Sequence, residues 1–108
     1  MADSLGKELS AALLNITSLI IKTESRSERM KLTRQQAQIA GRLQVFVDRT
    51  VDEAIPEYQA ATAALNTANG EAEAARKKLD RIAGTIRKFA AAIDKLMELA
   101  EKVITQSA

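Results

Sequence analysis

Apolar side chains recur every three or four residues along most of the chain, which is the spacing of one face of an α-helix. In the first segment, residues 3–22, this apolar stripe is broad because Leu14 and Ile21 flank it. A stripe of that width indicates a helix that packs against two neighbours rather than one. The segment is too short to be stable in isolation, so the pattern predicts a helix within a bundle.

A polar stretch separates this helix from the next one. Ser25 and Glu28 have the spacing of a capping box, so we predict a loop over residues 23–28. From residue 27 to residue 68 the apolar positions keep the alternating three- and four-residue steps of a coiled-coil seam. The seam passes Pro56 without a change of register, which favours one long helix with a kink at the proline over a new helix.

The Asn-Gly pair at 69–70 is the strongest helix-stop signal in the chain, because glycine readily adopts the left-handed conformation that ends helices. We therefore predict a hairpin turn at 69–70 and a third helix over residues 71–106. Residues 48–73 carry one base and six acids, whereas residues 76–95 carry seven bases and two acids. A reversal at 69–70 brings these opposite charges together. The alternative is one helix over about residues 27–106 in a domain-swapped assembly.

The predicted fold is all-α, with residues 1–108 forming a single helical domain. A long antiparallel hairpin, about 27–68 and 71–106, carries the shorter helix, about 3–22, on its base, as a coiled-coil-like three-helix bundle. Apolar positions between Ala54 and Ala75 are nearly all alanine, so we predict a slender two-helix tip there. The acids predicted to pair with Arg81, Arg87 and Lys88 are Asp48, Asp52, Glu53 and Glu57.

The composition argues against catalysis. The 108 residues include no His, Cys or Trp, so the chain has no imidazole base, cysteine nucleophile or thiolate metal ligand. Helical di-metal sites recruit His at a fixed spacing from Glu, which this chain lacks. Tyr58 occupies a seam position and is interpreted as a packing residue. We therefore predict a protein that is not an enzyme and that has no catalytic, cofactor-binding or metal-binding residues.

The start of the chain gives an expectation about location. It lacks the basic residues and the uninterrupted apolar stretch of a secretory signal, and no stretch has the ~20 apolar residues of a membrane span. We expect a cytoplasmic protein, and export by a dedicated secretion system that needs no signal stays open.

These exclusions leave a non-catalytic helical module for protein-protein interaction, of the adaptor, chaperone-like or inhibitor (immunity-type) kind. It is expected to bury an apolar helical face against a protein partner or a second copy, with an elongated homodimer preferred. On the tip, the candidate contact surface lies around Ala60, Ala64, Asn69 and Ala74. On the base, the candidate partner-binding residues are Leu13, Ile20, Phe46, Phe89, Met97 and Leu99.

The alternative function is the binding of nucleic acid or of a membrane surface through a basic stripe on the predicted third helix. A second basic cluster, over residues 22–34, is interpreted as a solvated connector. The net charge is only +2 and no aromatic side chains interleave the bases, which disfavours nucleic acid. The polar side of the first helix is rich in Ser and Asn rather than Lys, which disfavours a membrane surface. The candidate anion-binding stripe consists of Lys77, Lys78, Arg81, Lys88, Lys95 and Lys102.

Overall fold

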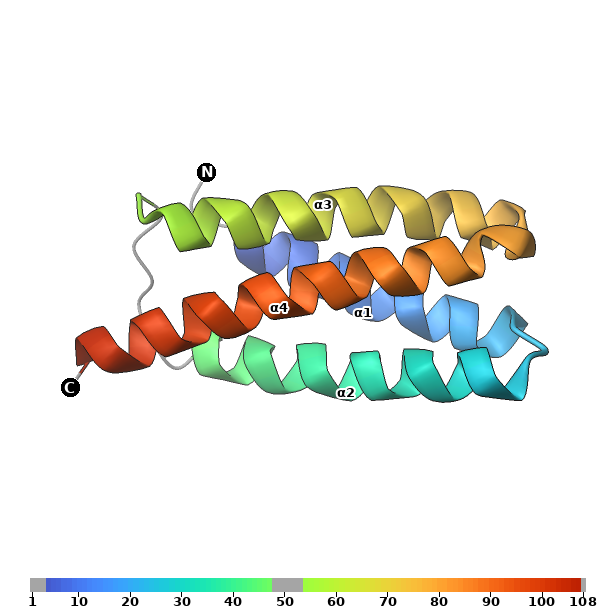
Figure 1. The fold of residues 1–108 in the computed structure, drawn as a ribbon, viewed down its shortest axis with the longest axis horizontal. Helices are drawn as coiled ribbons and strands as arrows, with labels where there is room; N and C mark the ends of the chain where they lie inside the picture. Colours follow the sequence, from blue (N-terminus) through green and yellow to red (C-terminus); the bar gives the residue numbers. More distant parts are fainter. Residues whose placement is uncertain (1–3, 48–53, 108) are drawn as a thin grey trace.

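Four long helices pack side by side in the computed structural model, which describes residues 4–47 and 54–107 (Figure 1). No strand occurs in this part of the chain, so the all-α class is confirmed. The bundle is elongated, with principal extents of 44 × 22 × 17 Å. The elements are α1 (Ser4–Lys22), α2 (Arg26–Val47), α3 (Pro56–Lys77), the short 3-10 helix η1 (Leu79–Arg81) and α4 (Ile82–Ser107).

Each long helix packs extensively against two others. α1 contacts α2 and α3, and α4 contacts the same two helices, so α2 and α3 lie at opposite corners of the bundle. Successive helices run in opposite directions (Figure 1). Two of the contacting pairs are therefore parallel, namely α1 with α3 and α2 with α4. The predicted packing of the first helix against two neighbours is confirmed, but four helices replace the predicted three.

The loop between α1 and α2 lies where the capping signal placed it. It is shorter than predicted, because α1 continues to Lys22 and α2 begins at Arg26. The Ser25 hydroxyl oxygen accepts a hydrogen bond from the backbone N–H of Glu28 at 3.3 Å, which caps α2. The Arg29 guanidinium donates to the carbonyl of Thr23 at 2.8 Å and ties the loop to the second helix.

Pro56 begins a helix and does not kink one, so the single helix predicted over residues 27–68 is wrong. α2 ends at Val47, and Pro56 is the first residue of α3, with Ile55 as its N-cap in extended conformation. Proline is well suited to this position, because the first N–H of a helix has no acceptor within the helix. The apolar register continues past Pro56 because two separate helices each bury one face.

The predicted turn at 69–70 is also wrong, because α3 runs through both residues to Lys77. None of the glycines in the described ranges has a positive φ, so Gly70 adopts no left-handed conformation. The chain reverses instead at Lys78, whose backbone is extended (φ −134°, ψ 101°), and at η1. The predicted third helix over 71–106 is therefore divided, with residues 71–77 in α3, Lys78 extended, and residues 79–106 in η1 and α4.

The alanine-rich segment forms no slender tip. It belongs to α3, which packs against both α1 and α4, and its small side chains allow the three helices to approach closely. The alternative of one helix over about residues 27–106 is likewise contradicted, because α2, α3 and α4 are separate helices. The largest fully buried side chains are Leu9, Ile16, Leu19, Leu32, Ile39, Leu65, Ile82, Thr85, Phe89, Leu96 and Leu99.

Replacing Gly70 by alanine tests the path of α3. Nothing lies within 4 Å of the position that a Cβ would occupy at Gly70, and the residue is in a helix interior. Alanine there is expected to raise the free energy of unfolding by about 0.5–1 kcal/mol. Gly41→Ala in α2 is the matched control and is expected to give a similar gain, because its surroundings are equally open. Loss of stability in Gly70→Ala alone, measured by urea denaturation, would indicate a turn at this residue.

Candidate interaction surface

The outward side of α1 carries two large apolar side chains that the bundle leaves exposed. Leu14 is 68% exposed and Ile21 is 78% exposed, the highest values among the large apolar side chains that the structure describes. The two residues are seven positions apart, which is about two helical turns, so they project on the same side. Leu13 and Ile20 are half-buried beside them and pack against the core. We call Leu14 and Ile21, with the helix surface between them, the α1 outer face.

α1 is apolar on its inward side as well. Leu9, Ile16 and Leu19 are fully buried there. A helix of this kind can be covered by two neighbours over only part of its circumference, because each adjacent helix hides one flank. The remaining sector is the α1 outer face, and its apolar residues are not explained by the packing of the chain itself.

A polar seam between α1 and α3 fixes the orientation of α1, and so decides which side faces outward. The buried Asn15 donates from Nδ2 to Oδ1 of the buried Asn69 at 3.1 Å. Asn69 in turn donates from Nδ2 to the Glu8 carbonyl at 3.1 Å and to the Glu8 carboxylate at 2.8 Å. Arg76 donates to Oδ1 of Asn15 at 3.3 Å. Any rotation of α1 would break several of these bonds together.

Tyr58 is part of the same interface, and the interpretation of it as a packing residue agrees with its position. Its side chain is buried, and its hydroxyl accepts a hydrogen bond from the backbone N–H of Leu5 at 3.2 Å. The tyrosine thus satisfies an N–H group near the start of α1, where the helix itself provides no acceptor.

The six predicted partner-binding residues do not form one surface. Phe89 and Leu99 are fully buried in the core, so neither can contact a partner while the chain is folded. Leu13, Ile20 and Phe46 are half-buried, and Met97 is 43% exposed on α4. Of the residues predicted to form the tip surface, Ala60 is exposed, Ala64 and Ala74 are half-buried, and Asn69 is buried in the seam with α1.

Sequence reasoning missed the two most exposed apolar residues of this surface. Leu14 and Ile21 were interpreted as the margins of a buried stripe. The signal that could have found them is the width of that stripe, since it exceeds what two neighbouring helices can cover. A second exposed pair, Met97 and Ile104, lies on α4 and also has seven-residue spacing, but each side chain is only about half exposed.

The predicted anion-binding stripe is divided between two places. Lys88, Lys95 and Lys102 are exposed along α4, whereas Lys77, Lys78 and Arg81 lie at the end of the bundle where α3 passes into η1. Lys95 forms an ion pair with Glu98 at 3.5 Å, and both side chains are about half exposed. Exposed pairs of this kind contribute little to stability, at most about 1 kcal/mol.

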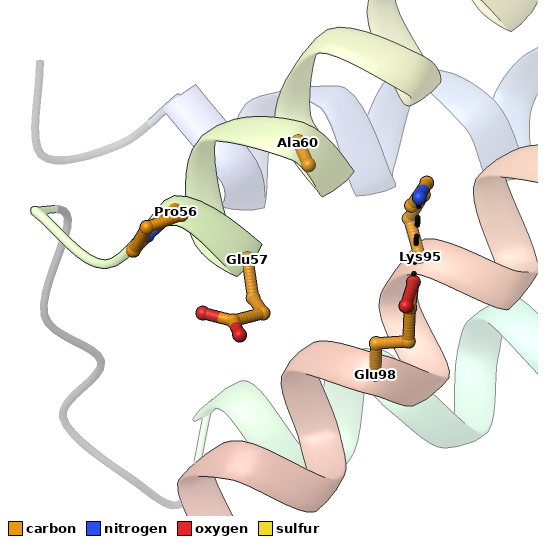
Figure 2. Close-up of a pocket in the computed structure, with 5 residues that line it drawn as sticks. All are labelled: Pro56, Glu57, Ala60, Lys95 and Glu98. Carbon is orange, nitrogen blue, oxygen red and sulfur yellow. Dashed lines mark ion pairs between the residues drawn. The ribbon is translucent and has the colours of Figure 1, made fainter.

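A shallow groove of about 150 Å³ lies between the start of α3 and α4 (Figure 2). Pro56, Glu57, Ala60, Lys95 and Glu98 line it, and Glu57 lies opposite the Lys95–Glu98 ion pair (Figure 2). The Glu57 Oε1 atom is buried and has no hydrogen-bond partner among the residues that the structure describes. The ammonium group of Lys95 would oppose a cation here, so the groove gives no indication of a metal site.

The acids predicted to pair with Arg81, Arg87 and Lys88 are placed differently. Asp48, Asp52 and Glu53 lie outside the described residues, and Glu57 faces the groove on α4 near Lys95. The later reversal of the chain moves the register between α3 and α4, which is why Glu57 does not lie beside Arg81. Within residues 4–47 and 54–107, no group of three or more acidic, His or Cys side chains is arranged to hold a metal ion.

In the same two ranges, no helix combines the length and the apolar character needed to cross a membrane. Comparisons of the chain with protein-family models, curated proteins and solved structures give no match. The geometry of the surface is therefore the only guide to function.

Proposed function

We propose that the chain is a non-catalytic helical interaction module that docks a protein partner on the α1 outer face, and that its first partner is a second copy of itself. The observation that carries this proposal is the exposure of Leu14 and Ile21 on a helix whose opposite side is fully buried. Transferring such side chains from water into an interface contributes about 1.5–3 kcal/mol each.

The arrangement of the α1 outer face suits contact with another copy of α1. In a two-fold symmetric pair the same patch serves both subunits. If two α1 helices cross antiparallel about an axis near Thr17 and Ser18, Leu14 of each copy packs against Ile21 of the other. The small side chains at 17 and 18 allow the two helices to approach closely.

The polar group at the centre of this contact already has its hydrogen bonds. The Thr17 hydroxyl donates to the carbonyl of Leu13 at 2.7 Å and accepts from Nε2 of Gln36 at 2.7 Å. Burying Thr17 in an interface therefore leaves neither the O–H group nor the hydroxyl oxygen without a partner, and the penalty for covering an unpaired hydroxyl is avoided.

The non-catalytic part of the proposal is supported by chemistry. The sequence has neither His nor Cys. The carboxylates that the groove brings together, Glu57 and Glu98, have Lys95 beside them. Such a set can bind a polar group at the surface, but it supplies no nucleophile activated by a neighbouring base.

The experiment replaces Leu14 and Ile21 together by glutamine. Both side chains project outward, so the double variant is expected to remain folded, with the circular dichroism spectrum of the unmodified chain. The dissociation constant of the dimer is expected to rise at least about a hundredfold, because two apolar side chains are lost from each copy. The measurement is oligomeric state as a function of concentration by sedimentation.

The matched control replaces Met97 and Ile104, the other exposed apolar pair with seven-residue spacing, by glutamine. This variant removes two half-exposed apolar side chains from α4 and is expected to associate like the unmodified chain. Equal weakening by both double variants would contradict a specific role for the α1 outer face.

A further inference from the structure

Two basic segments that are far apart in the sequence meet at one end of the bundle. The loop between α1 and α2 and the connection through η1 lie at the same end (Figure 1). Lys22 at the end of α1 donates to the carbonyl of Arg76 in the last turn of α3 at 3.4 Å. On the other side, Gln35 of α2 donates to the carbonyl of Ile86 at 2.8 Å, which places the first half of α2 alongside the start of α4.

This end concentrates the positive charge of the protein. Residues 21–30 and 76–81, which we call the basic end, hold seven bases and three acids, a net charge of +4. The whole chain carries +2, so all other residues together carry −2. The acids are Glu24, Glu28 and Asp80. The bases, all exposed, are Lys22, Arg26, Arg29, Arg76, Lys77, Lys78 and Arg81.

Within the described ranges no ion pair joins these bases to an acid, and an additional acid, Glu73, lines a hollow with Lys22, Arg76 and Lys77. The one ion pair found there, between Lys95 and Glu98, lies away from this end on α4. Lys22 and Arg29 donate to uncharged backbone carbonyls, which position their side chains without neutralising their charge. The basic end therefore presents a net positive surface assembled from four elements.

The basic end also carries exposed apolar side chains. Ile21 is 78% exposed at the end of α1, Met30 is 58% exposed in the second turn of α2, and Leu79 is 43% exposed in η1. Apolar residues among basic ones are typical of proteins that insert into the headgroup layer of an anionic membrane. Single-stranded nucleic acid would favour aromatic side chains for stacking, and the basic end has none.

We propose that the basic end docks on the surface of an anionic lipid bilayer. Leu79 enters the headgroup layer, and the surrounding Lys and Arg side chains contact the lipid phosphates and carboxylates. The site differs from the α1 outer face and does not depend on dimer formation, although Ile21 lies where the two surfaces meet. The sequence disfavoured a membrane because the polar side of the first helix is rich in Ser and Asn, whereas the basic end draws its positive charge from several elements.

The test is sedimentation of the full chain with vesicles at low ionic strength. Binding is expected with phosphatidylcholine vesicles that contain roughly 30% phosphatidylserine, and little binding is expected with pure phosphatidylcholine. Neutralising Lys77, Lys78 and Arg81 together by glutamine is expected to weaken binding at least about tenfold, because each base near an anionic surface contributes to attraction. Leu79→Ser is expected to weaken it about threefold or more.

The matched control neutralises Lys88, Lys95 and Lys102 by glutamine. It removes the same charge from the flank of α4 and is expected to change vesicle binding less than about twofold. Met97→Ser is the corresponding control for Leu79→Ser, and circular dichroism verifies that every variant is folded.

Three results would overturn the proposal. One is the absence of sedimentation with the anionic vesicles. Another is equal loss of binding in the two triple variants, which would indicate a response to net charge alone. The third combines two observations. The chain binds a short DNA duplex tightly and the Lys77, Lys78 and Arg81 variant loses that binding, whereas Leu79→Ser leaves vesicle binding unchanged. That combination would assign the basic end to nucleic acid.

Discussion

Replacing Phe89 by alanine is expected to lower the free energy of unfolding by about 3–5 kcal/mol. Phe89 is fully buried in α4 and is among the largest side chains in the core. Its removal takes away apolar contacts and leaves a cavity that the surrounding helices fill only in part. Domains of this size typically have a free energy of unfolding of only about 5–15 kcal/mol, so the substitution is expected to remove a substantial share of it. Urea denaturation followed by circular dichroism measures the change.

The control for Phe89→Ala is Met97→Ala on the same helix. Met97 is 43% exposed, and its truncation is expected to cost less than about 1 kcal/mol. The comparison also decides between two roles for Phe89. A variant that kept full stability and lost only partner binding would show that Phe89 is a contact residue, contrary to its buried position.

Replacing Asn69 by alanine is expected to cost about 1–3 kcal/mol, because it leaves buried polar groups on α1 without partners. Asn69 is 4% exposed and bonds to both Asn15 and Glu8 across the interface. Alanine is the better helix former, so helix propensity alone would give a gain in stability. The sign of the change therefore measures the contribution of the polar seam, and thermal denaturation is a suitable assay.

Asn66→Ala provides the comparison for Asn69→Ala. Asn66 lies one turn earlier on the same helix, is exposed, and donates one hydrogen bond to the Glu8 carboxylate at 2.9 Å. Its loss is expected to cost less than about 0.5 kcal/mol, since water can replace an exposed partner. Equal effects at 66 and 69 would contradict a buried network that sets the position of α1.

Local signals located the parts of the fold that depend on local physics. α1 and the Ser25 cap of α2 follow from periodicity and capping, which act within a few residues. The inward side of α4 was likewise visible, since Ile82, Phe89 and Leu96 keep the spacing of a buried stripe. These elements needed no knowledge of their neighbours.

The errors arose where contacts between distant residues outweigh local preference. Asn69 would end an isolated helix readily, but in the bundle its amide is bonded to α1, and Gly70 continues the helix. The true reversal at Lys78 contains neither Gly nor Pro, so composition gave no signal of it. The prediction that Glu57 lies beside Arg81 was wrong for the same reason.

The candidate surfaces required the structure for a different reason. Whether Leu14 and Ile21 are covered depends on how much of α1 its two neighbours hide, which periodicity does not specify. The basic end joins residues 21–30 and 76–81, which are about fifty positions apart in the chain. Each segment by itself resembles an ordinary solvated connector. The candidate lipid-binding surface forms only because the fold brings the two segments to the same end of the bundle.

The central claim is that the α1 outer face binds a second copy of the chain. The most direct measurement is the molar mass in solution by light scattering, for the unmodified chain and for the Leu14→Gln, Ile21→Gln double variant. The expected result is a mass about twice the 11.7 kDa of one chain for the unmodified protein and a single-chain mass for the variant. An unmodified chain with the mass of a monomer at high concentration, or a double variant that stays dimeric, would contradict the claim.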